Sequence, residues 1–270
     1  MMDVLFGWWQ YDFMRYAFFA ILLIMPLFAL LGTLIVGSGM AFFSDALGHS
    51  ALTGVGIGML LGFSEYRLVM VVFVVLFALA MNRIRRSRIS STDTVIGVFS
   101  SCGVALGLVI LSSGGGMARV QGLLIGDILT VMPEDLLVLG IALAAISGIW
   151  LLYFNRMYAV SINVSLARSK GIAVGLIDNL FVVLVAVIVM LSIQWTGLLI
   201  INAMLILPAA AARNISRSLR GYLGWTLVFG LFSGAWGLIL SYIVAAAAGP
   251  MIVLVAASLY FGTFILRGRS

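Results

Sequence analysis

Asp45 and His49 are the residues of this sequence best suited to chemistry. They lie four residues apart in the stretch FSDALGHSAL, and His49 is the only histidine of the chain. On a helix this spacing places both side chains on one face, with Thr53 one turn further along. A carboxylate oxygen and an imidazole nitrogen so placed can bind one divalent cation, because zinc and manganese both accept such ligands.

Two ligands are too few for a closed tetrahedral site. A homodimer with its two-fold axis through the site would supply four, and such an open site suits an ion that must be released. A structural interpretation is also open: Asp45 would cap the start of a helix, and His49 would hydrogen-bond a carbonyl oxygen. A membrane environment favours the ligand interpretation, because ionisable residues are costly to bury there and are usually functional.

The composition indicates such an environment. Of the 270 residues, 64% are hydrophobic and only 9% are charged, whereas soluble domains carry roughly 25% charged residues. Several apolar runs reach the ~20 residues that cross a bilayer as a helix. Runs such as FVVLVAVIVMLSI are continuous and lack the alternation of a β-barrel strand. We therefore predict an all-α, polytopic transmembrane helical bundle.

The apolar segments predict eight or nine membrane-spanning helices that form a single domain over residues 1–270. The second and seventh segments are short and rich in small residues, which leaves the count open. The predicted spans are 14–36, 46–62, 67–82, 93–113, 134–154, 173–193, 196–212, 222–247 and 250–266.

Four arginine-containing segments set the orientation. They lie at 82–91, 167–171, 213–220 and the C-terminal tail, and the positive-inside rule assigns them to the cytoplasm. The net charge of +6 is explained in this way and does not point to nucleic acid. The loop 114–133 then lies outside, where we predict a short helix followed by a span that begins at Pro133.

A row of small residues runs beside the Asp45–His49 pair. Small residues at every fourth position let helices approach closely within a membrane, so we predict that this helix is packed tightly by its neighbours. The row consists of Ala46, Ser50, Gly54, Gly58 and Gly62.

The segment SDALGHSALTGVGIGMLLG resembles the Asp-x-x-x-His segment of the metal-ion ABC transporter permeases, which import zinc, manganese or iron(II). Four further segments resemble that family in the same order, and together they span most of the chain. One of them, LLIGDILTVMPEDLL, looks closer to zinc-importing than to manganese-importing permeases. The four are STDTVIGVFSSCGVALGLVIL, LLIGDILTVMPEDLL, GLLIINAMLILPAAAAR and AGPMIVLVAASLYF.

The resemblance implies an ABC importer permease of the bacterial inner membrane. Two permease copies would line a path for Zn²⁺, or alternatively Mn²⁺ or Fe²⁺, and Asp45 and His49 would coordinate the ion. Cytoplasmic ATPase subunits would drive transport, and an extracytoplasmic metal-binding protein would deliver the ion. The sequence has no Gly-x-x-x-x-Gly-Lys-Ser/Thr loop, so we expect a transport subunit rather than an enzyme, with no permanently bound cofactor.

The resemblance also implies a cytoplasmic segment, about 160–175, that couples the permease to the ATPase. Ala167 and Gly171 match the family's spacing there, with Arg168 beside them; an ordinary basic loop is the alternative. Thr53 and Asn202 are candidates to line the path, although Asn202 could equally bridge two helices.

Three other acids have local interpretations. Asp93 is expected to cap the fourth span, and Asp178 to extend toward the cytoplasmic edge of the sixth. Asp127 either caps a turn or contacts the binding protein.

Two other functions compete with metal import by an ABC permease. An ABC permease for an organic or chelated-metal substrate would need no ligand pair. An ion-coupled secondary carrier would require several intramembrane acids, and this sequence has few.

Overall fold

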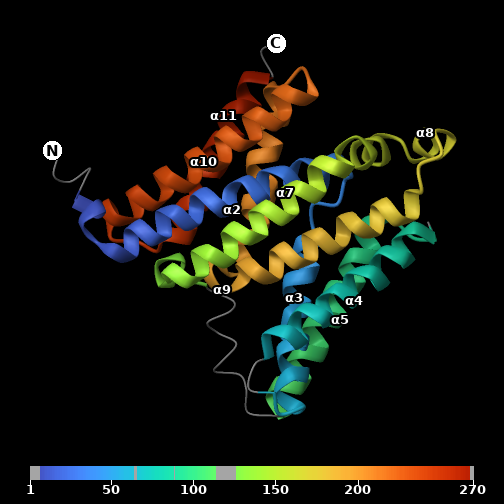
Figure 1. The fold of residues 1–270 in the computed structure, drawn as a ribbon, viewed down its shortest axis with the longest axis horizontal. Coiled ribbons are helices and arrows are strands. Elements are labelled where there is room, and N and C mark those ends of the chain that lie inside the picture. Colours follow the sequence, from blue (N-terminus) through green and yellow to red (C-terminus); the bar gives the residue numbers. More distant parts are fainter. Residues whose placement is uncertain (1–6, 64–65, 88, 114–125, 268–270) are drawn as a thin grey trace. The chain divides into compact units, whose positions relative to one another are not determined.

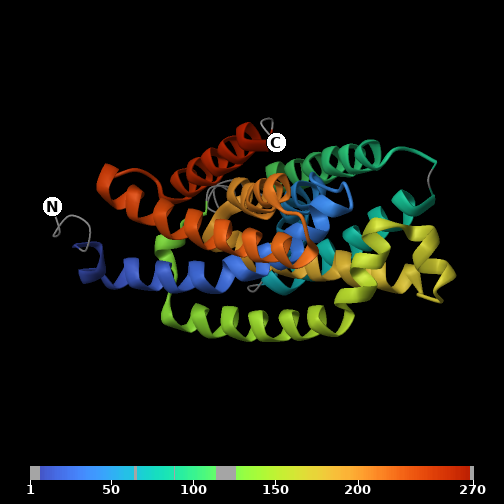
Figure 2. The same cartoon turned by 90° about the horizontal axis from the view of Figure 1, so that it is seen from above.

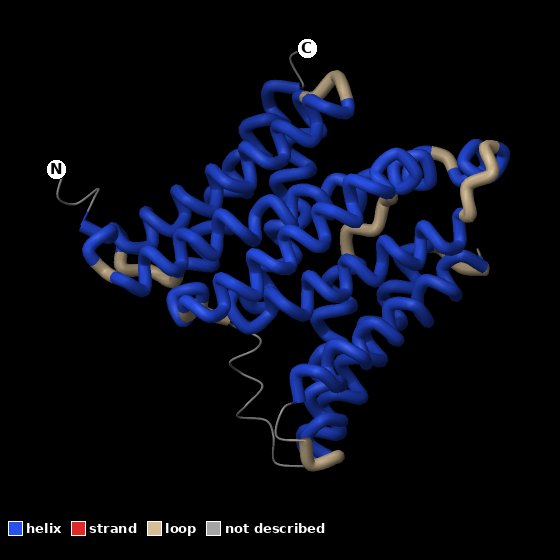
Figure 3. Tube along the Cα trace, in the orientation of Figure 1, coloured by secondary structure: helices blue, strands red, loops and turns tan. Residues whose placement is uncertain are grey.

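The computed structural model describes residues 7–63, 66–87, 89–113 and 126–267. Within these ranges the regular secondary structure is entirely helical, as Figure 3 shows. The prediction of an all-α polytopic bundle is therefore confirmed. In chain order the elements are η1 (Gly7–Gln10), α2 (Asp12–Gly37), α3 (Phe43–Leu60), α4 (Tyr66–Ser87), α5 (Thr92–Ser113), η2 (Ile128–Thr130), α7 (Pro133–Ile162), α8 (Val164–Ser169), α9 (Val174–Ile215), α10 (Leu219–Val244) and α11 (Ala248–Arg267).

Seven helical segments of the described chain are long and apolar enough to cross a membrane. They are α2, α4, α5, α7, the Val174–Leu198 part of α9, α10 and α11. Two other apolar segments, α3 and Ile200–Ile215, correspond to the second and seventh predicted spans, which the sequence marks as short. All nine predicted segments are thus helical.

The sixth and seventh predicted spans are two helical segments, the two parts of α9 on either side of a kink at Gly197. The φ of 71° and ψ of 163° at Gly197 are not helical, so the helix that begins at Val174 is interrupted there and a second one runs on to Ile215. Gly126, also at positive φ, packs directly on this kink, and a Cβ added to it would collide with the Gly197 backbone. Glycine is required at both positions. Gly197 adopts a positive φ that other residues rarely adopt, and Gly126 has no room for a side chain.

The loop predicted at 114–133 is described only in its second part. Residues 114–125, where we predicted a helix, lie outside the described residues. The described part contains the short 3-10 turn η2, and α7 begins at Pro133 as predicted.

The helices group into two compact units. The α10 unit comprises Met1–Val36, Gly126–Leu152 and Trp195–Ser270, and the α3 unit comprises Gly37–Ile125 and Tyr153–Gln194. Helices α3, α4, α5 and α8 belong to the α3 unit, whereas α7 and α9 each contribute one part to each unit. That the whole chain folds as a single domain stays a prediction.

Within the α10 unit, α10 and α11 lie side by side, as both views show (Figures 1 and 2). Their contact is close enough that a Cβ added to Gly237 would collide with the Ile252 backbone. In the same unit the Trp195 indole nitrogen donates a hydrogen bond of 3.2 Å to Asp135, at the start of α7. These contacts connect the start of α7 to α9, and α10 to α11.

Within the α3 unit, α3 packs against both α4 and α5 (Figure 1). A Cβ added to Gly54 would lie 2.8 Å from Met70 Cα, and one added to Gly103 of α5 would lie 3.2 Å from Ser50 Cα. The predicted close packing of the small-residue row is therefore confirmed at Ser50 and Gly54. Gly62 does not belong to this row, because it lies beyond the end of α3 at a φ of +73° with no atom close by.

Two glycines of α5 test this packing. A Cβ at Gly107 would lie 2.8 Å from Leu52 Cβ and 2.9 Å from Thr53 N, whereas a Cβ at Gly97 would meet no atom within 4 Å. We expect Gly107→Ala to lower the free energy of unfolding by about 1–3 kcal/mol, because α3 must shift. Gly97→Ala should leave it unchanged or raise it by up to about 1 kcal/mol, because alanine favours helix. Denaturant titration in detergent measures both, and equal effects would contradict the close approach.

Candidate metal centre

Asp45 and His49 are the only partly exposed residues in an otherwise buried part of α3, and we call this accessible pair the polar opening. Every other residue from Phe43 to Gly56 is buried, while the side chains of Asp45 and His49 are 34% and 30% exposed. His49 Nε2 lies 3.4 Å from Asp45 Oδ2. The i, i+4 spacing therefore brings the two side chains together at one polar opening, as the helical periodicity predicts.

The capping interpretation of Asp45 is wrong. Helix α3 begins at Phe43, its N-cap is Phe42, and no side chain caps it. Asp45 lies inside the first turn, one helical turn before His49. A carboxylate in the first turn still interacts favourably with the helix dipole, and this one also lies within ion-pair distance of the imidazole.

One chain offers a cation at this place two side-chain ligands. Among the described residues, no group of three or more His, Cys, Asp or Glu side chains is placed to hold a metal ion. An ion bound by Asp45 and His49 must complete its coordination with water, backbone oxygen or a second chain. Such incomplete ligation suits an ion that passes through.

The two candidate pathway residues, Thr53 and Asn202, differ in burial and lie in different units. Thr53 belongs to α3 but is buried, and its hydroxyl donates a hydrogen bond of 2.6 Å to the Gly103 carbonyl of α5. Its hydroxyl is therefore used in helix packing. Asn202 is partly exposed and belongs to the α10 unit. A lining role stays a prediction for both.

The predicted coupling segment contains a short helix of its own, α8. The Asn163 side chain caps it by accepting a hydrogen bond of 3.0 Å from Leu166 N. Gly171, at a φ of 73°, ends it, and the Ala167 carbonyl accepts from Ile172 N across this turn. Ala167 is buried and Arg168 is exposed, so α8 presents a basic side chain on a well-defined turn. That it docks on an ATPase stays a prediction.

A polar network that the sequence does not predict ties α4 to α9. Arg85 donates to Asp178 Oδ2 at 2.6 Å and to Asn82 Oδ1 at 2.6 Å. Asn82 in turn donates to Asn179 Oδ1 at 2.9 Å. The prediction for Asp178 is therefore wrong: its side chain is 12% exposed and pairs with Arg85 rather than extending to the edge. The one local signal was the placement of polar residues at the end of one span and the start of another.

The other two acids differ in outcome. Asp127 does cap η2, accepting a hydrogen bond of 2.9 Å from Leu129 N, so the capping alternative is confirmed. Asp93 is not the cap of α5, because the helix already begins at Thr92 and the Ser91 hydroxyl accepts from Thr94 N at 3.1 Å.

The sequence is similar to membrane proteins of metal transport systems. It is 31% identical to the high-affinity zinc uptake system membrane protein ZnuB of Haemophilus influenzae, over 88% of this chain and 92% of that protein. It is 30% identical to the manganese transport system membrane protein MntC of Halalkalibacterium halodurans, over 96% of this chain and 89% of that protein. These identities do not separate zinc from manganese.

Two solved structures share the fold. PsaBC from Streptococcus pneumoniae, in complex with Fab, has a TM-score of 0.84 and 29% identity, covering 98% of this chain and 95% of that chain. An inward-facing putative metal-chelate type ABC transporter has a TM-score of 0.68 at 18% identity, over 93% and 86% of the two chains, and supports the fold alone. The sequence from residue 10 to residue 267 matches the ABC 3 transport family. The chain therefore belongs to this family, as a multi-pass protein of the bacterial inner membrane.

Proposed function

We propose that the chain is the membrane-spanning permease subunit of an ATP-driven importer of a divalent transition metal, and that Asp45 and His49 coordinate the ion on its way through. The observation that carries this proposal is the polar opening on α3. A carboxylate and an imidazole 3.4 Å apart are the two side chains left accessible on an otherwise buried stretch. Ionisable groups at such a place are costly, which argues for a function.

The ligand set favours a cation that is bound and then released. One chain contributes one carboxylate and one imidazole, and a second copy would bring the number to four. Zinc is the favoured ion, because imidazole suits zinc whereas manganese prefers oxygen ligands. Manganese and iron(II) are the alternatives, and the similarity to manganese transport proteins supports manganese.

The proposed partners are a second permease copy, cytoplasmic ATPase subunits and an extracytoplasmic metal-binding protein. Helix α8, with Ala167, Arg168 and Gly171, is the proposed ATPase-docking element. Helix α8 is followed within a few residues by α9. Asp178 and Asn179 of α9 are hydrogen-bonded to side chains of α4, and α4 packs on α3. This continuous series of contacts within the α3 unit is a physical route from α8 to the Asp45–His49 pair.

Transport in proteoliposomes tests the function. We expect the permease, reconstituted with its ATPase, to take up radioactive zinc only when ATP is supplied, with manganese as a competitor. Uptake that persists without the ATPase would identify an ion-coupled carrier instead. Absence of metal uptake, together with uptake of a chelate that free zinc and manganese do not inhibit, would identify a permease for organic or chelated substrates.

A further inference from the structure

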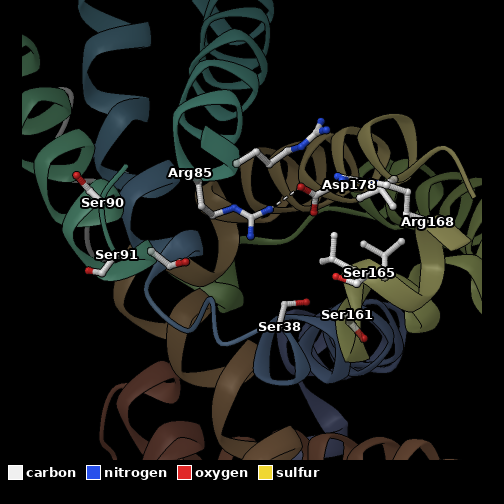
Figure 4. A pocket seen from close by; sticks show the side chains of 13 residues that line it. Ser38, Arg85, Ser90, Ser91, Ser161, Ser165, Arg168 and Asp178 are labelled. Carbon is white, nitrogen blue, oxygen red and sulfur yellow. Dashed lines mark hydrogen bonds and ion pairs between the residues drawn. The ribbon is translucent and has the colours of Figure 1, made fainter. Parts of the chain in front are cut away.

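The α3 unit also contains a basic cavity of ≈620 Å³, which lies between the ends of its helices (Figure 4). The end of α4, the end of α7, α8 and the starts of α5 and α9 all contribute to its wall. Arg85 reaches from α4 toward Asp178 of α9, with Ser38 and Ser161 on the other side of the space. The cavity is thus a place where several polar side chains converge.

Its charge is positive. Three arginines and one aspartate line it, Arg85, Arg86, Arg168 and Asp178, which gives three positive charges less one negative, or +2. Arg85 pairs with Asp178 at 2.6 Å. Within the described part of the chain, neither Arg86 nor Arg168 has a carboxylate partner. Two guanidinium groups therefore line the cavity without an ion-pair partner among the described residues.

Arg86, although exposed, adds a full positive charge next to the start of a helix. A Cβ added to Gly175 would lie 2.9 Å from both terminal nitrogens of Arg86, so the guanidinium lies against the first turn of α9. The N-terminus of a helix already carries a partial positive charge, and a cation there is the wrong sign. Backbone N–H groups at a helix start and a neighbouring guanidinium are together well suited to phosphate oxygens.

Hydroxyl groups complete the lining. Six serine and threonine side chains contribute to the wall, including Ser161 at the end of α7, Ser165 in α8, and Ser91 and Thr92 at the start of α5. Hydroxyls donate hydrogen bonds to anionic oxygens without adding negative charge. The basic loops that surround the cavity belong to the side that the positive-inside rule assigns to the cytoplasm.

From this arrangement we infer that the cavity binds a phosphate group, with Arg86 and Arg168 as its main ligands. The phosphate belongs either to the headgroup of an anionic phospholipid or to a free soluble phosphate. Basic pockets between transmembrane helices on the cytoplasmic side recognise anionic headgroups through the same chemistry. The site is separate from the proposed metal ligands, so it stands whether or not the chain transports a metal.

Ligand-dependent thermal unfolding of the purified full-length chain in detergent tests the site. Short-chain phosphatidylglycerol, short-chain phosphatidylcholine and inorganic phosphate are titrated separately. We expect phosphatidylglycerol or phosphate to raise the unfolding temperature in a saturable way, since a ligand of the folded state stabilises it. Phosphatidylglycerol acting alone identifies a lipid headgroup site, and inorganic phosphate acting equally well identifies a soluble anion. Neutral phosphatidylcholine should have the smaller effect.

Substitutions locate the binding. Arg86→Gln and Arg168→Gln should each raise the half-saturating concentration roughly tenfold, as the loss of a charge-assisted hydrogen bond does. The matched control, Arg83→Gln with Arg217→Gln, removes two exposed arginines that do not line the cavity. It should leave the half-saturating concentration unchanged. The single variants serve if the double variant Arg86→Gln/Arg168→Gln does not fold. Stabilisation by neither anion, or unchanged half-saturation in the Arg86 and Arg168 variants, would overturn the inference.

Discussion

Asp45→Asn and His49→Gln should each reduce ATP-dependent metal uptake in proteoliposomes by at least about 100-fold. The two side chains meet 3.4 Å apart at the only opening in the Phe43–Gly56 part of α3. Asp45→Asn keeps the shape of the side chain but removes its negative charge, and His49→Gln removes the imidazole nitrogen. Changes to groups that merely orient a ligand already cost 10–100-fold, so loss of the ligand itself should cost more. Initial rates of radioactive zinc uptake measure the effect.

A matched acid elsewhere controls for the change of charge. Glu134, like Asp45, lies in the first turn of its helix, α7, but is exposed and has no histidine beside it. Glu134→Gln should therefore retain uptake. The two α3 variants should still copurify with the ATPase, which separates loss of a ligand from loss of assembly. Normal uptake in both α3 variants would mean that the ion passes elsewhere.

Asp178→Ala should lower the free energy of unfolding by about 2–3 kcal/mol. Arg85 and Asp178 are only 15% and 12% exposed, so the change leaves a largely buried guanidinium without its carboxylate, hydrogen-bonded to Asn82. Hydrogen bonds to charged groups contribute about 1.5–3 kcal/mol, and unpaired buried charge costs more than the intact pair contributes. Denaturant titration in detergent measures the loss.

Two variants delimit this effect. Asp12→Ala breaks an exposed ion pair with Arg15, whose side chains are 69% and 40% exposed, and should cost less than about 1 kcal/mol. The double variant Arg85→Met/Asp178→Leu should recover much of the stability lost in Asp178→Ala, because it leaves no unpaired charge. If Asp178→Ala lowers the free energy of unfolding by no more than Asp12→Ala does, the α4–α9 network does not stabilise the folded state.

The features predicted from sequence are those that depend on neighbouring residues. Membrane-spanning helices follow from local hydropathy, and the Asp45–His49 contact follows from a spacing of four. The small-residue row predicted close packing, which Ser50 and Gly54 show. Each of these signals lies within about one span of sequence.

The features that were missed depend on distant residues or on backbone geometry. Arg85 and Asp178 are 93 residues apart, and no local pattern links them. The close approach of Gly126 to the kink at Gly197 joins positions some 70 residues apart in the chain. The burial that leaves only Asp45 and His49 accessible on α3 is likewise a product of tertiary packing.

The most direct test of the proposed function is the metal content of the purified transporter complex. Elemental analysis of the complex loaded with zinc or manganese should find about one ion for every two permease chains, since two chains together offer four ligands. The same complex with His49→Gln should retain its subunits and lose that ion. An equal metal content with and without His49 would contradict the assignment of the site.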